Sequence, residues 1–306
     1  MYRFINTMAV LIAVTVFSTN AQAVTKMRCS HQLPPSHHIA KAIDKWAALV
    51  EEKSGGELEV QVFGANSLVG ARQNIVSVAK GEIECAFSLN FQWGKTLPIM
   101  MVTMAPFAFQ DIEMWRKWPE SEAAKYLDDK LLTKGVHNVV WMFQTNVAVF
   151  TSKDKFLIKP EDFKGVKIRG LIPAFNASLE ALGAAPSSMS GSKVYQALAT
   201  GVIDAGLTDV AAAYARKYYE VQDHFVVLPL LSASFHGYVN SKWYDGLSET
   251  AKTALAEAGR EAAAFTVDMA EEAVKEAPDL LRSKGVKVHI ATPEEISTLE
   301  AVMRPA

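Results

Sequence analysis

Short strand-like runs alternate with amphipathic helical runs at the start of this chain, and this alternation constrains the fold more than any other feature. A strand over 26–30 is followed by a helix over 36–53 that Ser36 caps, a strand over 58–63, a helix over 71–80 and a strand over 85–89. A β-α-β-α-β order of this kind predicts an α/β protein with a parallel, doubly wound sheet flanked by helices.

The same order returns in the second half of the chain. The segments 79–85 (AKGEIEC) and 199–205 (ATGVIDA) share a helix end, a glycine, an isoleucine, an acidic residue and a small residue before a strand. A match this short also arises by chance. Together with the returning strand–helix order, it favours two similarly built lobes over one continuous domain.

A long helical pattern rich in Ala, Glu and Lys covers 248–283 and contains Gly259 and Pro278. One helix of about 36 residues would reach about 50 Å, which is longer than one lobe is wide. It would then connect both lobes as a shared spine. The alternative is a pair of helices that is broken at Gly259.

The first 23 residues are typical of a secretory signal, with Arg3, an apolar run over 8–17 and a small-residue cleavage site at 21–23 (AQA). The apolar run is shorter than the roughly 20 residues that span a bilayer, so an uncleaved anchor is the less favoured alternative. We therefore expect a soluble protein exported to a bacterial periplasm. Cys29 and Cys85 lie in strand-like runs, and we favour two buried thiols over a disulfide.

Composition and motifs exclude several classes of protein. The chain is 50% hydrophobic and has 31 basic against 33 acidic side chains, which argues against a disordered chain and against a nucleic-acid binder. No nucleophile elbow, P-loop, zinc-protease or dinucleotide-binding motif is present. His31, His37 and His38 lack a second ligand cluster, and the last two lie where a helix begins, so we favour a cap and surface role over catalysis or a metal site.

Several short segments together point to one family. They are 55–60 (GGELEV), 81–84 (GEIE), 105–109 (APFAF), 160–169 (PEDFKGVKIR), 194–198 (VYQAL), 201–204 (GVID) and 218–222 (YYEVQ). In this order and spacing the chain resembles the periplasmic solute-binding proteins of TRAP (tripartite ATP-independent periplasmic) transporters, of the DctP type. The resemblance covers nearly the whole mature chain.

The resemblance implies a two-lobed fold like that of type II periplasmic binding proteins. Each lobe is then a mostly parallel sheet flanked by helices, with a long helix spanning both. Lobe I is expected to comprise 24–148 plus about 233–265, and lobe II 149–232 plus about 266–306. It also implies TRAP permease membrane subunits as partners of a monomeric receptor, with no cofactor and no metal.

Arg169 is the main candidate for ligand binding. It closes the family's D-x-K-G-x-K-x-R motif, whose arginine binds the ligand's carboxylate with both prongs. A guanidinium is a planar fork that matches a carboxylate, and the pair is stronger in a cleft without water. The alternative is an arginine that extends from a strand end into solvent.

Further ligand contacts are expected at strand ends, where ligands of parallel sheets gather. The candidates are Asn90, Phe91, Gln92, Trp93, Asn146, Thr208 and Asp209. Alternation would place Phe91 and Trp93 on one face, with one of them in the core. The asparagine that many relatives carry near Thr208 is absent, which leaves the polar contact there open.

Two departures from the family limit the class of ligand that we expect. Relatives that bind sialic acid have a second arginine near Val149 and an acid near Leu89, and both positions are apolar here. Relatives that bind 2-oxo acids through a metal use a Glu-Trp pair near 207–208, which is also absent. We therefore predict a small organic anion, a monocarboxylate, bound without a metal. An enzyme with Asp209 or His236 as base and a ligand-sensing receptor are the alternatives.

Overall fold

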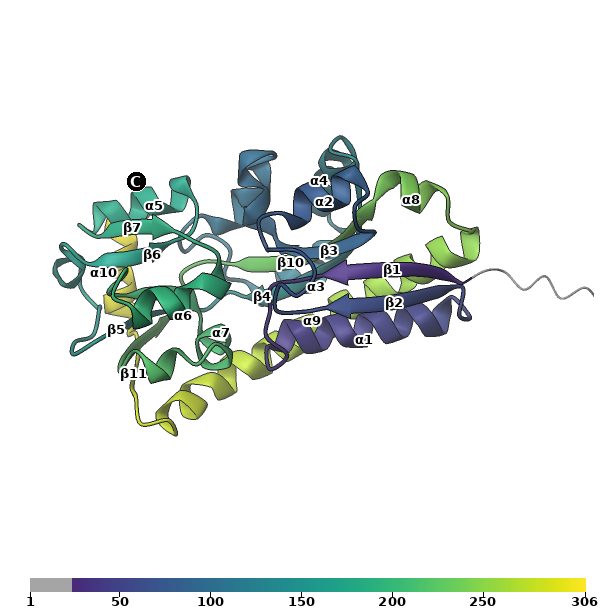
Figure 1. Cartoon of the computed structure of the whole chain (residues 1–306). Helices are drawn as coiled ribbons and strands as arrows, with labels where there is room; N and C mark the ends of the chain where they lie inside the picture. The colour runs from purple at the N-terminus through teal and green to yellow at the C-terminus, as the bar shows by residue number, and fades with distance from the viewer. Residues whose placement is uncertain (1–23) are drawn as a thin grey trace, which may run out of the picture.

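Two large β-sheets, one in each lobe, lie along the molecule in the computed structural model, which describes residues 24–306 (Figure 1). Helices pack against both sheets, so the two-lobed α/β architecture expected from the sequence is confirmed. The predicted secretory signal over 1–23 lies outside the described residues. Within residues 24–306, no helix is both long and apolar enough to cross a membrane.

The sheet of lobe I has five strands in the order β2-β1-β3-β10-β4. Its strands are β1 (Thr25–Ser30), β2 (Leu58–Phe63), β3 (Cys85–Leu89), β4 (Val136–Thr145) and β10 (Ala233–Asn240). The surrounding helices are α1 (His38–Lys53), α2 (Asn74–Lys80), α3 (Ile112–Lys117), α4 (Glu122–Leu132) and α8 (Ser241–Asp245), with 3-10 turns η1 (Asn90–Lys95), η2 (Pro98–Met104) and η3 (Trp118–Glu120). β1, β2 and β3 run parallel, and β10 is antiparallel to both β3 and β4.

The main sheet of lobe II has the order β11-β9-β5-β8, and a two-stranded β6-β7 unit adjoins it through a bridge between Ile168 and Ala205. The strands are β5 (Ala148–Ser152), β6 (Lys167–Gly170), β7 (Ala185–Ser188), β8 (Gly206–Asp209), β9 (His224–Leu228) and β11 (Lys287–Ile290). The helices are α5 (Pro173–Ala181), α6 (Gly191–Ala199), α7 (Val210–Ala215) and α10 (Pro293–Met303), with 3-10 turns η4 (Pro160–Phe163) and η5 (Tyr218–Glu220). Strand β8 begins at Gly206, directly after the segment 199–205 that the sequence predicted to precede a strand.

Helix α9 (Glu249–Arg282) is one continuous helix of 34 residues that runs along both lobes (Figure 1). Gly259 does not break it, so the alternative of two helices is wrong. A Cβ at Gly259 would lie 2.1 Å from the carbonyl oxygen of Val139 in β4. The glycine therefore lets the helix approach the strand closely.

Successive parts of α9 pack in different lobes. Val267 and Ala270 belong to the apolar cluster around Trp93 in lobe I, whereas Ala277 and Leu281 pack with the core of lobe II. The chain also crosses between the lobes through residues 146–147 and 229–232. These two short connections and α9 join the lobes, which is the arrangement of a hinge with a spine.

Cys29 and Cys85 face each other on the neighbouring parallel strands β1 and β3. Both are free thiols without solvent exposure, as the sequence predicted. Burial raises the pKa of the Cys29 thiol well above its ordinary value. Because both residues are buried, they pack as small apolar side chains of the sheet.

Candidate ligand-binding site

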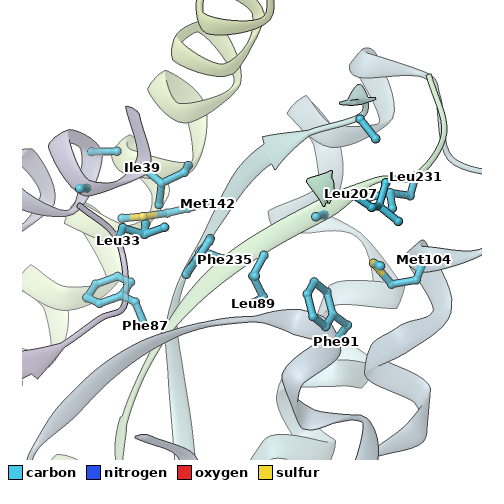
Figure 2. Close-up of a cluster of buried hydrophobic side chains, with 14 of the residues drawn as sticks. Leu33, Ile39, Phe87, Leu89, Phe91, Met104, Met142, Leu207, Leu231 and Phe235 are labelled. Atoms are coloured by element: carbon cyan, nitrogen blue, oxygen red, sulfur yellow. The ribbon is translucent and has the colours of Figure 1, made fainter. Parts of the chain in front are cut away.

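A small cavity of about 30 Å³ lies between the lobes, at the ends of several strands. Lobe I and the second connection contribute Leu89, Phe91, Gln144, Thr145, Leu231 and Ala233; lobe II contributes Arg169, Leu171, Leu207, Thr208, Asp209 and Arg216. This volume is about the same as the volume that one molecule occupies in liquid water. Around Arg169 the two lobes are thus almost in contact. Figure 2 shows the apolar part of this region, with Leu207 and Leu231 beside Met104 and Phe91.

Arg169 lies in the short strand β6 and is only 3% exposed. Its Nη1 donates a hydrogen bond of 2.6 Å to the Leu207 carbonyl, and Nε and Nη2 each lie 3.4 Å from the Met189 carbonyl. Burial lowers the pKa of Arg169 to about 10, so the side chain stays charged at neutral pH. The alternative of an arginine that extends into solvent is wrong. A buried guanidinium bonded to neutral oxygens is suited to receive an anion.

Arg216 brings a second guanidinium to the cavity, which the sequence analysis missed. It follows α7 directly, and its Nη1 donates a hydrogen bond of 3.1 Å to Thr208 Oγ1. Its Nε is buried without a hydrogen-bond partner among the described residues. Asp209 and Arg216 flank the short helix α7, and both line the cavity. An arginine after a helix is usually a solvated terminus, which is why no local signal pointed to it.

Asp209 lines the cavity, but both oxygens of its carboxylate already accept hydrogen bonds within the protein. Its Oδ1 accepts a hydrogen bond of 2.7 Å from the backbone N–H of Ala212, which caps α7, and its Oδ2 accepts one from the Gln144 amide. His37 Nε2 lies 3.7 Å from the same Oδ2. Burial by itself raises the pKa of Asp209, but these neighbours favour the carboxylate and hold the pKa well below its usual range. The carboxylate therefore holds lobe I against lobe II.

His37 is buried and His38 is half-buried, so the predicted surface role is wrong for His37. His37, and not Ser36, caps α1, because its Nδ1 accepts a hydrogen bond of 3.1 Å from the Ile39 N–H. The two rings stack with centroids 4.6 Å apart. Burial lowers the pKa of His37, and lowers that of His38 to about 3, so both rings are neutral at pH 7.

Of the four candidates after β3, the structure brings only Phe91 to the cavity. The chain turns into the 3-10 helix η1 after Leu89, so strand alternation no longer applies and Phe91 and Trp93 do not share a face. Trp93 has no solvent exposure and packs edge-on against Tyr238 in lobe I.

The remaining amides serve the scaffold. Asn90 Nδ2 donates to the Met100 carbonyl and to Thr103 Oγ1, each at 2.9 Å. Gln92 Oε1 accepts from the Leu89 N–H at 2.9 Å. Asn146, in the connection after β4, donates to the Gln110 carbonyl at 2.8 Å. Asn90, Gln92 and Asn146 therefore fix the rim and the hinge, and none of them lines the cavity.

The geometry offers little for catalysis. His236 has no solvent exposure and lies between the rings of Trp93 and Trp141, with Nδ1 2.9 Å from Asn138 Oδ1. Burial lowers the pKa of His236 to about 3. Residues 24–306 contain no group of three His, Cys, Asp or Glu side chains placed to hold a metal ion.

A second, apolar cavity of about 480 Å³ lies between the 3-10 helix η2 of lobe I and the start of α5 in lobe II. Its walls are Pro98, Ile99, Met101, Val102, Met104, Ala105, Pro106, Ile172, Ala174 and Phe175. Ile172 directly follows Leu171, which lines the small cavity. Both cavities therefore lie along the contact between the lobes.

Comparisons with known proteins agree on one family. The profile described as "Bacterial extracellular solute-binding protein, family 7" (DctP) matches residues 29–306. The C4-dicarboxylate-binding periplasmic protein DctP of Rhodobacter capsulatus is 29% identical over 288 residues, which cover 91% of this chain and 84% of that protein.

Solved structures give the same result. A TRAP periplasmic solute-binding protein from Roseobacter denitrificans with bound β-D-glucuronate is 26% identical, with a TM-score of 0.84 and 92% of each chain covered. A TRAP periplasmic solute-binding protein from Sulfurospirillum deleyianum with bound succinate has 24% identity, a TM-score of 0.84 and the same coverage. The latter likeness concerns the fold.

Proposed function

We propose, because this chain belongs to family 7 (DctP) of the bacterial extracellular solute-binding proteins, that it captures a small organic anion between its lobes and binds the anion's carboxylate through Arg169. The family is one of receptors and not of enzymes. The observation that carries the proposal is the burial of Arg169 at the contact between the lobes, with only neutral oxygens as hydrogen-bond partners.

A bound carboxylate would complete the site electrostatically. A buried cation loses its hydration, and carbonyl dipoles replace only part of it. A carboxylate that accepts two parallel N–H bonds from the guanidinium restores that loss, and the low dielectric between the lobes strengthens the pair. The apolar walls of Leu207, Leu231 and Phe91 then bury the rest of the ligand, at about 25 cal/mol per Å².

Ligand entry requires the lobes to separate, because about 30 Å³ does not admit an organic acid. Hydrogen bonds that link the lobes include those from Arg72 Nη2 to the Ser188 carbonyl, at 3.2 Å, and from Gln144 to Asp209. Opening about the short connections at 146–147 and 229–232 exposes the cavity and leaves each sheet intact. Closure around a ligand then creates the surface that a partner recognises.

The partner we propose is the membrane permease of a TRAP transporter, to which a monomeric receptor delivers its ligand. The relatives named above support a periplasmic location. Deleting the gene should abolish uptake of the ligand, and the mature protein should appear in the periplasmic fraction without residues 1–23. Normal uptake in the deletion strain would contradict the transport role and favour a sensing receptor.

The ligand can be found by a thermal-shift screen of organic acids against the mature chain, because a compound that binds only the folded state raises the melting temperature. Calorimetry then compares the wild type with Arg169→Ala and Arg169→Lys, and with Arg260→Ala as a matched control on the exposed face of α9. We expect both Arg169 variants to weaken binding about tenfold or more, since lysine keeps the charge but not the fork. An unchanged dissociation constant in Arg169→Ala would remove this residue from the site.

A further inference from the structure

Two arginines, and not one, line the cavity between the lobes. Their hydrogen bonds go to neutral oxygens: Arg169 donates to the carbonyls of Leu207 and Met189, and Arg216 to the hydroxyl of Thr208. In the described part of the chain, neither forms an ion pair within 4.0 Å. The positive charge of Arg216 also helps to lower the pKa of Arg169, after the larger effect of burial. Two cations that repel each other are thus held together before any ligand is present.

Neighbouring residues fix the position of the Arg216 guanidinium. A Cβ on Gly191 would lie 2.8 Å from Cζ and 2.9 Å from both Nη atoms of Arg216, so the guanidinium occupies the space that a side chain there would need. Thr208 Oγ1 fixes Nη1 from the strand side. Nε is buried and has no hydrogen-bond partner within residues 24–306. The group is therefore positioned, and it keeps an unused donor.

The nearby carboxylate does not neutralise the pair. Both oxygens of Asp209 accept hydrogen bonds elsewhere, from the Ala212 N–H and from Gln144. His37 and His38 are neutral, so they add no charge. Since Asp209 forms no hydrogen bond with either arginine, each guanidinium keeps its charge without an anionic partner among residues 24–306, and each can bind one anionic group of a ligand.

We propose that Arg216 is a second anion-binding residue of the cleft, and that the ligand carries a second anionic group for it, beyond the carboxylate bound by Arg169. This inference rests on the proposed function and makes it narrower. The monocarboxylate prediction relied on the apolar residues at positions 89 and 149. It did not include an arginine that reaches the same cavity from the end of α7.

The test compares short straight-chain diacids with their half-amides, which have the same shape but lack one charge. Succinate against succinamate and glutarate against glutaramate are the probes, measured by calorimetry on the mature protein. Arg216→Gln removes the charge. Gly191→Ala keeps the charge but displaces the guanidinium, and Lys217→Gln removes an exposed charge next to it as the matched control.

In the wild type we expect a diacid to bind about tenfold more tightly than its half-amide, because one charge-assisted contact is lost in the half-amide. Arg216→Gln should reduce this ratio to near one by weakening the diacid alone, Gly191→Ala should reduce it in part, and Lys217→Gln should leave it unchanged.

Three results would overturn the inference. The first is equal affinity of diacid and half-amide in the wild type, which leaves the proposed function intact. The second is an unchanged ratio in Arg216→Gln or, if that variant does not fold, in Gly191→Ala. The third is a stable protein that binds no carboxylic acid at all, which refutes the proposed function as well.

Discussion

Replacing Gly259 by alanine tests how tightly the spine helix packs on lobe I. The new Cβ would lie 2.1 Å from the Val139 carbonyl oxygen, whereas real Cβ atoms stay beyond about 3.0 Å from such neighbours. Helix and strand must therefore move apart by about 0.9 Å. The obstacle is backbone, so no side-chain rotation relieves it.

The expected magnitude is the difference between two effects. Overpacking in a filled interior typically destabilises by about 1–3 kcal/mol, and a backbone clash belongs at the upper end. Alanine in place of glycine favours the helix by about 1 kcal/mol. We expect the free energy of unfolding of Gly259→Ala to fall by about 2 kcal/mol.

Urea denaturation followed by far-ultraviolet circular dichroism measures this change as a lower midpoint with an unchanged slope. Ala256→Gly, on the exposed side of the same helix, calibrates the propensity effect and should lose about 1 kcal/mol. If Gly259→Ala is as stable as the wild type or more so, the close contact between α9 and β4 does not exist as described.

Two other predictions concern pH and the aromatic residues after β3. Burial lowers the pKa of His236 to about 3, so the unfolded state binds the proton first. The stability of the wild type relative to His236→Asn should fall by about 1.4 kcal/mol per pH unit from pH 6 to pH 4. Denaturant titrations at several pH values measure this, and a constant difference would contradict it. Trp93→Ala should lose about 3–5 kcal/mol of stability in the same titrations. Phe91→Ala should chiefly weaken ligand binding in calorimetry. If Phe91→Ala lowered the stability and Trp93→Ala weakened binding instead, Phe91 would be the core residue and Trp93 the cavity residue.

Much of the fold could be predicted from the sequence, because the local sequence signals agree with the final structure. Ser248 and Ser283 mark the two caps of α9, and a glycine with left-handed backbone, at positions 81 and 201, ends each of the two related helical segments. The effect of Gly259 could not be predicted from the sequence, because a glycine inside a helix can either break the helix or allow a close contact. Only the position of Val139 decides between them.

The site was predicted only in part, because its walls come from distant segments. Arg169 was found through a contiguous motif. Arg216 and Gln144 carry no such signal, since their position depends on how β8 and β4 end beside each other across the two lobes. The assumption that alternation continues beyond Leu89 failed because η1 follows it directly.

The crossings between the lobes have a consequence for biogenesis. Neither sheet is built from consecutive strands: β10 inserts between β3 and β4 only after β5 to β9 of lobe II, and β11 joins β9 only near residue 290. A chain emerging progressively from a ribosome or a translocation pore would keep both half-built sheets open until most of it is available. Maturation should therefore be a late event: a nascent chain stalled before residue 233 should remain sensitive to proteases in both lobes, and one stalled before residue 287 should remain sensitive in lobe II.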